Sequence, residues 1–181
     1  AGWRRLHKLI AAGRQAGFGP EELVALDRIE KAGAEAECTL PLDRALHALS
    51  LPIPSLRRAL TGWLITRFPA SGLQAGHAIG WFGRPGGVPL VLWKKRLESC
   101  GLRMAAKGDA PTHLVIGDPP YPERAAITPS PGVLDQSILE FYLAREEARY
   151  LQTEENPEQA DRLQRMLRSR DTSFLRLAIS F

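Results

Sequence analysis

Hydrophobic residues recur at helical spacing through the first third of the chain. Between residues 3 and 68, leucine, isoleucine and tryptophan stand three or four positions apart with charged residues between them, a pattern typical of amphipathic helices. Pro20, Pro41, Pro52 and Pro54 divide this stretch, and proline suits the first turn of a helix. The pattern therefore predicts four short helices, arranged as a small bundle or as a helical repeat.

The pattern changes after Pro69, where residues 69–72 are predicted as a linker. Short apolar runs separated by glycine and proline then predict four strands, at residues 78–82, 102–104, 112–117 and 126–128. Two helices are predicted, at residues 88–99 and 134–151, and Gly101 is expected as the left-handed cap of the first. Strands that alternate with helices in this way indicate an α/β fold built on a parallel sheet.

Three domains follow from this organisation. We expect a helical region at residues 1–70, an α/β domain at 71–151 and a helical extension at 152–181. The chain begins at Ala1 rather than at Met and stops at Phe181 within an amphipathic stretch. We therefore expect the sequence to be a piece of a larger protein.

The composition is that of an ordinary globular protein. Of 181 residues, 44% are hydrophobic and 24% are charged, which excludes intrinsic disorder. Cys38 and Cys100 are too few for a disulfide framework, and no apolar run reaches the roughly 18–20 residues that cross a bilayer. These features favour a reduced, cytoplasmic setting without membrane contact. The net charge is +4, with +3 on residues 1–70, +3 on 71–133 and −2 on 134–181, so the first two thirds of the chain favour contact with phosphate or nucleic acid.

Three segments in the middle of the chain carry a family resemblance. They are the expected strand Ile79–Gly83, the helix that ends at Cys100 and Gly101, and the segment Thr112–Gly117 with its Thr-His-Leu-Val sequence. On these segments, residues 76–143 resemble a BRCT domain. The resemblance implies a four-stranded parallel sheet with two helices on one face and one on the other. It also implies association with proteins or DNA ends, often in DNA repair.

The chain departs from the family pattern at three places. Phosphate-binding members offer a Ser or Thr hydroxyl after the first strand, where this chain has Arg84–Gly87. The proline-rich residues 118–125 provide no candidate for the second helix of the family. The tryptophan usual in the last helix is absent, with Phe141 or Tyr142 in its place.

The end of the chain carries a second resemblance. Residues 163–178 are similar to the helical-repeat units that bacterial multidomain proteins attach near leucine-rich repeats. This resemblance implies a scaffold-like parent protein.

The turn between the first strand and the following helix is the candidate ligand site. Backbone amides at the start of a helix point toward a bound phosphate, and an arginine beside them adds a charge-assisted contact. We predict an anion site formed by Arg84, Gly86, Gly87 and Lys107, with Lys94 and Lys95 in support. The alternatives are that the glycines only make a tight turn and that the lysines form a solvated helix face. Three adjacent helical residues fan over roughly 200°, so residues 94–96 cannot all face one ligand.

Other reactive or aromatic residues favour structural roles. The four histidines and two cysteines lack the spacing of a metal site, and no group of residues has catalytic spacing, so we expect no metal, no cofactor and no enzyme activity. His113 is expected to be a partly buried structural residue. Trp3, Trp63 and Trp81 are predicted in the core, and so is Trp93 despite the basic run that follows it.

Together these features predict a non-catalytic binding or scaffold module. Its expected ligand is a protein partner or a phosphorylated ligand, in a DNA-associated process such as repair. Two alternatives stay open, a DNA-binding module that acts through a basic surface and a structural spacer in a repeat scaffold.

Overall fold

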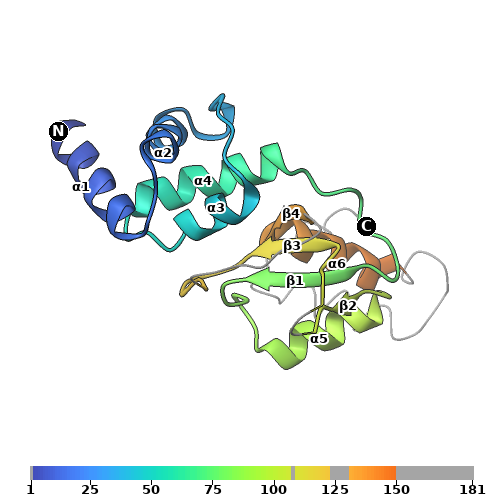
Figure 1. The fold of residues 1–181 in the computed structure, drawn as a ribbon. Coiled ribbons are helices and arrows are strands. Elements are labelled where there is room, and N and C mark those ends of the chain that lie inside the picture. Colours follow the sequence, from blue (N-terminus) through green and yellow to red (C-terminus); the bar gives the residue numbers. More distant parts are fainter. Residues whose placement is uncertain (1, 107–108, 123–130, 150–181) are drawn as a thin grey trace.

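The computed structural model describes residues 2–106, 109–122 and 131–149 (Figure 1). Their helices are α1 (Gly2–Gln15), α2 (Pro20–Ala32), α3 (Leu42–Ala48), α4 (Pro54–Arg67), α5 (Leu90–Ser99) and α6 (Gln136–Arg149), with a 3-10 turn, η1 (Gly33–Glu35). Their strands are β1 (Ala78–Phe82), β2 (Arg103–Met104), β3 (His113–Ile116) and β4 (Gly132–Asp135). The predicted helical extension at 152–181 and the predicted strand at 126–128 lie outside these residues.

The four predicted helices of the first third are confirmed, and glycine and proline set their limits. Gly17 takes a left-handed backbone angle of 78° between α1 and α2, which glycine adopts without strain. Pro20 begins α2, and the Gly19 N–H donates to the Glu22 carboxylate at 2.8 Å. Pro54 begins α4, without a side-chain cap.

The four strands form one parallel sheet in the order β2-β1-β3-β4. The predicted α/β fold with a small parallel sheet and helices on both faces is therefore confirmed. β1 has the predicted bounds, and α5 ends at the predicted cap, where Gly101 has a φ of 73°. All four residues of β3 are buried, as expected for a central strand covered on both faces.

One face of the sheet shares a core with the helical region. The sheet contributes Phe82, Leu114, Ile116 and Val133, which pack in one cluster with buried residues of α1–α4. Figure 1 shows α3 and α4 on this side of the sheet. No helix was predicted at residues 118–125. Helices from the first third of the chain cover this face of the sheet instead.

The other face is covered by α5 and α6. Ile79, Val115 and Leu134 point to this side and pack in a second cluster with Trp93 and Leu97 of α5. Alternate residues of a strand face opposite sides of a sheet, and these three alternate with the residues of the first core. The predicted helix 88–99 is confirmed to within two residues as α5.

The start of the last helix was predicted wrongly. Leu134, expected to begin the helix, lies in β4 beside Val115, and α6 begins at Gln136. The Asp135 carboxylate accepts the Ser137 N–H at 2.9 Å, so it caps the helix. Residues 133 and 134 are both apolar because they face the two cores, a pattern that also fits a buried helix.

The tryptophans divide between core and surface. Trp63 and Trp93 are each 1% exposed, so their predicted burial is confirmed, and His113 is buried as expected. Trp3 is 72% exposed, because α1 buries only Leu9 and Gly13, so its assignment to the core was wrong. Trp81 is partly buried against the second core.

The predicted linker at 69–72 begins as part of the sheet edge. Pro69 forms a parallel bridge with Val133, and the Val133 N–H donates to the Phe68 carbonyl at 2.7 Å. The connection from α4 is therefore held against β4.

Candidate functional site

The carboxyl ends of the strands place polar residues on one edge of the sheet. Gly83 and Arg84 follow β1, Gly117 and Asp118 follow β3, and Asp135 ends β4. Because the strands are parallel, these residues emerge on the same side. This edge is where open α/β sheets commonly bind ligands.

Two loops at this edge are bonded to each other through their backbones. The Arg84 N–H donates to the Asp118 carbonyl and the Asp118 N–H donates to the Arg84 carbonyl, each at 2.7 Å. A Cβ on Gly117 would lie 2.3 Å from the Arg84 carbonyl oxygen, so only glycine permits this approach. The backbone at Arg84 is thereby fixed while its side chain is exposed.

The predicted anion contact at Gly86 is occupied from within the chain. The Gly86 N–H donates to Gln136 Oε1 at 2.8 Å, and its carbonyl accepts the indole N–H of Trp93 at 3.1 Å. A Cβ on Gly86 would lie 2.9 Å from Asp118 Oδ2, so a carboxylate stands beside this amide. Arg84 and Gly87 are the predicted site residues of the turn that remain exposed.

The predicted lysines are divided between different places. Lys94 and Lys95 lie exposed on α5, and Lys94 makes a 3.9 Å contact with Glu98. Arg96 turns instead toward α6, where Nε lies 2.9 Å from the Glu147 carboxylate. The expectation that this basic run cannot face one ligand is confirmed. Lys107 lies outside the described residues.

A groove of about 480 Å³ opens between α4 and the carboxyl ends of β3 and β4. Its polar lining residues are Arg57, Arg58, Thr61, Tyr121 and Asp135. Tyr121 lies against the turn that follows β1, since a Cβ on Gly83 would be 2.9 Å from the Tyr121 ring. Gly117 also lines the groove and lies against Arg84 of the same turn. The groove and the turn are therefore neighbours.

Most polar groups of the groove already have partners. The Arg57 guanidinium lies 5.4 Å from the centre of the Tyr121 ring and donates to the Leu49 carbonyl at 3.3 Å. The Tyr121 hydroxyl donates to the Gly117 carbonyl at 2.9 Å, and burial raises its pKa. Asp135 caps α6.

Two guanidinium groups near this edge have no partner among the described residues. They belong to Arg58, on the second turn of α4, and to Arg84, in the β1 turn, and both are exposed. A guanidinium presents a planar fork of donors that matches carboxylate and phosphate oxygens. The edge can thus hold an anionic group of a ligand.

The sequence offered little indication of Arg58, Tyr121 or Gln136. Pro54 marked the start of α4 and so placed Arg58 near a helix start. Nothing in the local pattern placed that helix over the ends of β3 and β4, because the contact joins segments about sixty residues apart.

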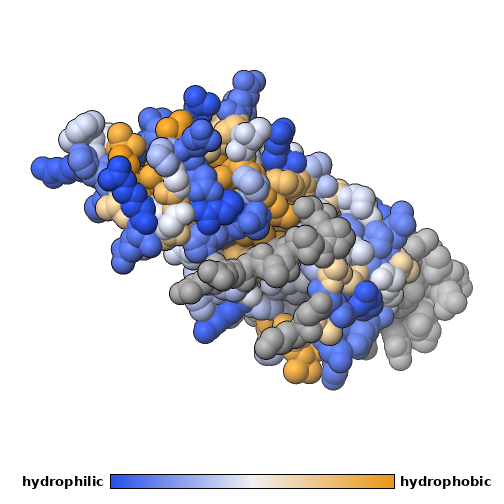
Figure 2. Space-filling view, viewed as in Figure 1, coloured by the Kyte–Doolittle hydropathy of each residue, from blue (hydrophilic) through white to orange (hydrophobic). Residues whose placement is uncertain are grey.

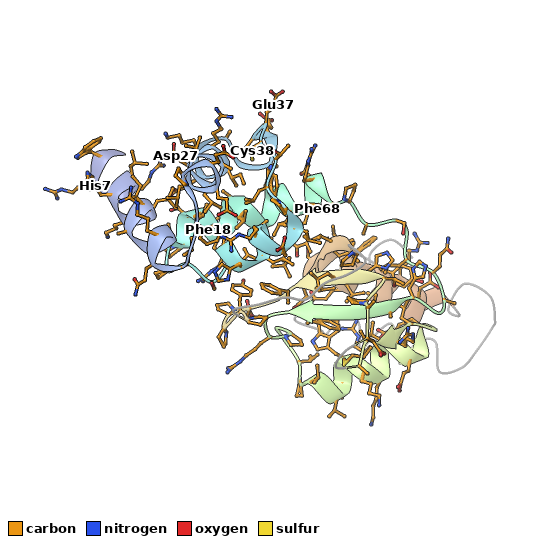
Figure 3. The ribbon with its side chains drawn as sticks, viewed as in Figure 1. His7, Phe18, Asp27, Glu37, Cys38 and Phe68 are labelled. Carbon is orange, nitrogen blue, oxygen red and sulfur yellow. The ribbon has the colours of Figure 1, made fainter. Side chains whose placement is uncertain are left out.

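A larger groove of about 840 Å³ lies on the helical region, between α2 and the segment that follows η1. Figure 3 shows two of its residues, Glu37 and Cys38, on the side of this region away from the sheet. Burial raises the pKa of the Cys38 thiol, which makes it a poor nucleophile at neutral pH. Within the described residues, no group of His, Cys, Asp or Glu has the geometry to hold a metal ion.

Among the described residues, no helix combines the length and the apolar character needed to cross a membrane. No protein-family model, curated protein or solved structure matches this chain.

Proposed function

We infer that the protein is a non-catalytic binding module that recognises a phosphorylated segment of a partner protein at the carboxyl edge of its sheet. The observation that carries this proposal is the pair of exposed guanidinium groups of Arg58 and Arg84, neither of which has a partner within the described part of the chain. They lie beside a groove and a turn that share Gly117 and Tyr121. The resemblance of residues 76–143 to BRCT domains implies association with proteins or DNA ends and supports a protein partner, whereas the phosphate is inferred from the two arginines alone, because the chain has Arg84–Gly87 where phosphate-binding members offer a Ser or Thr hydroxyl.

The bonding of the edge favours binding over catalysis. Tyr121 and Asp135, the titratable groups of the groove besides the arginines, are each engaged in a structural hydrogen bond. A general acid or base must reach a reacting proton, whereas these groups hold the backbone of β3 and α6. Surroundings of this kind fix the backbones that carry the two arginines, at Arg84 through the bonds to Asp118 and at Arg58 through α4.

The charges of the edge favour a single phosphate over an extended nucleic-acid backbone. The carboxylates of Asp118 and Asp135 follow β3 and end β4, and Glu140 lies in the first turns of α6. A duplex must place successive phosphates along a continuous basic track. Carboxylates interrupt such a track here but leave room for one anionic group.

The test is fluorescence anisotropy with phosphoserine peptides from a degenerate library and with their unphosphorylated counterparts. We expect phosphate-dependent binding that Arg58→Ala and Arg84→Ala each weaken roughly 10- to 100-fold, since a hydrogen bond to a charged group contributes about 1.5–3 kcal/mol. Arg14→Ala is the matched control, because Arg14 is exposed on α1, distant in sequence from the site.

Three results would contradict the proposal. One is equal affinity for phosphorylated and unphosphorylated peptides. Another is unchanged phosphopeptide affinity in both arginine variants. The third is tighter binding to duplex DNA than to any peptide, with the steep salt dependence of a phosphate backbone, which would favour DNA binding through the basic surface.

A further inference from the structure

The outer face of α5 carries apolar side chains that the described part of the chain leaves uncovered. Leu90 and Val91 are 53% and 66% exposed, and they are adjacent in the first turn of the helix. Single exposed apolar residues are ordinary, but a contiguous group marks a contact surface. Figure 2 shows an orange patch in the area where Figure 1 places the beginning of α5.

The next turn of the same face is basic. Lys94 follows Leu90 by four residues and Lys95 follows Val91 by four, and residues four apart in a helix share a face. Both lysines are exposed; Lys94 has a 3.9 Å contact with the exposed Glu98, and Lys95 has no ion-pair partner among the described residues. The surface is thus apolar at one end and positive at the other.

The opposite face of α5 fixes this surface in place. Trp93 and Leu97 are 1% and 0% exposed in the second core. The Trp93 indole is bonded to the Gly86 carbonyl, and Arg96 is paired with Glu147 of α6. A helix held on its inner side at three points presents its outer side chains on a backbone that is already ordered, which favours affinity for a partner.

We propose that Leu90, Val91, Lys94 and Lys95 form a docking surface for an acidic segment of a partner protein that also carries apolar side chains. The apolar turn would bury the partner's aliphatic or aromatic groups, and the two lysines would face its carboxylates. This charge complementarity selects the partner's chemistry. The surface is distinct from the phosphate site at Arg58 and Arg84, and the proposal stands whether or not that site binds a phosphate.

A lipid surface is the less favourable occupant. Interfacial helices combine a large apolar face with a polar face rich in cations, whereas the outer face of α5 carries two exposed apolar side chains, two lysines and Glu98. An apolar turn beside two cations is a better match in size to a short peptide segment.

The experiment begins with a displayed library of random peptides of about twelve residues, selected on the whole chain. We expect the selected peptides to combine Asp or Glu with apolar residues. Labelled copies of the best peptide are then titrated against two variants, Val91→Ser and the double variant Lys94→Glu with Lys95→Glu. We expect each to weaken binding about tenfold or more, as truncation of a central contact does.

Matched controls separate this surface from the rest of the molecule. Val24→Ser makes the same change on α2, at a valine that is 53% exposed against 66% for Val91, and Lys8→Glu reverses an exposed charge on α1. Both should leave the affinity for the selected peptide within about twofold of the unmodified chain, because contacts far from an interface are energetically neutral. Arg58→Ala should do the same, which distinguishes this surface from the phosphate site.

Several outcomes would overturn the proposal. They are the absence of any enriched peptide, enriched peptides without acidic residues, an affinity that Val91→Ser leaves unchanged, and binding of anionic lipid vesicles that Val91→Ser abolishes. Val91 is exposed, so its replacement leaves the core intact, and circular dichroism of the variant verifies this. Concentration-dependent self-association that Val91→Ser removes would also overturn it, by making a second copy of the chain the occupant.

Discussion

Both faces of the sheet are buried, but the helices that cover them come from different parts of the sequence. One face is covered by α5, which follows β1 in the chain, and by α6, which follows β4. The other face is covered by helices that all precede the first strand. The first arrangement can be predicted from the local sequence pattern. The second depends on packing between a helical region and a sheet that are distant from each other in the sequence. We therefore regard residues 2–68 as part of the sheet's core rather than as an independent appendage.

The largest expected effect tests this shared core. Phe82 is 2% exposed and packs in the cluster formed with α1–α4. Phe82→Ala should lower the free energy of unfolding by about 3–5 kcal/mol, the range for a buried phenylalanine. The change in free energy is measured by urea unfolding, which is monitored through the NMR signals of two indole N–H groups. Trp63 reports the first core, where it is bonded to the Ala36 carbonyl, and Trp93 reports the second.

The two indole signals should be lost at one urea concentration, before and after the substitution. If the Trp63 signal disappears at lower urea than the Trp93 signal, the helical region unfolds alone and the shared core does not couple the two parts. Val24→Ala is the control, because Val24 is exposed on α2 and its loss should cost little.

The difference between the faces also explains which elements the sequence could predict. The bounds of β1 and α5 were predicted to within two residues because their apolar runs are bounded by glycine and proline. β4 was missed because Val133 and Leu134 serve two different cores, so its apolar pair lacks the alternation of a one-sided strand.

The site was predictable to a smaller extent than the fold. Arg84 and the glycines were recognisable because a Gly-rich turn between a strand and a helix has a known chemistry. The engagement of Gly86 was not, since Gln136 is fifty residues away. Arg58 joins the same edge only through the packing of α4 on the sheet, which no local pattern encodes.

A smaller effect is expected from Gln136, which ties the two helices of the second face together. Its Oε1 accepts the Gly86 N–H before α5, and Gln136 itself begins α6. Gln136→Ala should lower the free energy of unfolding by about 1–2 kcal/mol, because it removes the bond from Gly86 and the one that Gln136 Nε2 donates to Glu140. It should also free the amide for an anion and raise phosphopeptide affinity a few-fold, by less than about 1.4 kcal/mol.

Isothermal titration calorimetry with the phosphoserine peptides measures the affinity, and urea unfolding measures the free energy of unfolding. Gln136→Glu is the companion variant: it retains an oxygen acceptor for Gly86 but adds a negative charge, and should weaken phosphopeptide binding. Equal affinities in all three proteins would place the ligand away from the Gly86 turn.

The smallest effect concerns an ion pair within the helical region. The Glu22 carboxylate of α2 accepts hydrogen bonds from Arg44 of α3, with Arg44 Nη2 at 2.8 Å, and this contact lowers the pKa of Glu22. A lowered carboxyl pKa contributes stability above its ordinary value of 4.5, and this contribution is lost as the pH falls through the lowered pKa. Because the pair is partly exposed, we expect less than about 1 kcal/mol.

Urea midpoints at about pH 7 and about pH 3 measure this loss, with the Trp93 indole as the probe. Glu22→Gln should be less stable than the unmodified chain at neutral pH, and the difference should shrink in acid, whereas Glu21→Gln, at an exposed position of the same turn, should behave like the unmodified chain at both. Trp93 lies in the core remote from this pair. A pH effect of Glu22 that Trp93 reports therefore requires the helical region and both faces of the sheet to unfold as one unit, and its absence would separate them.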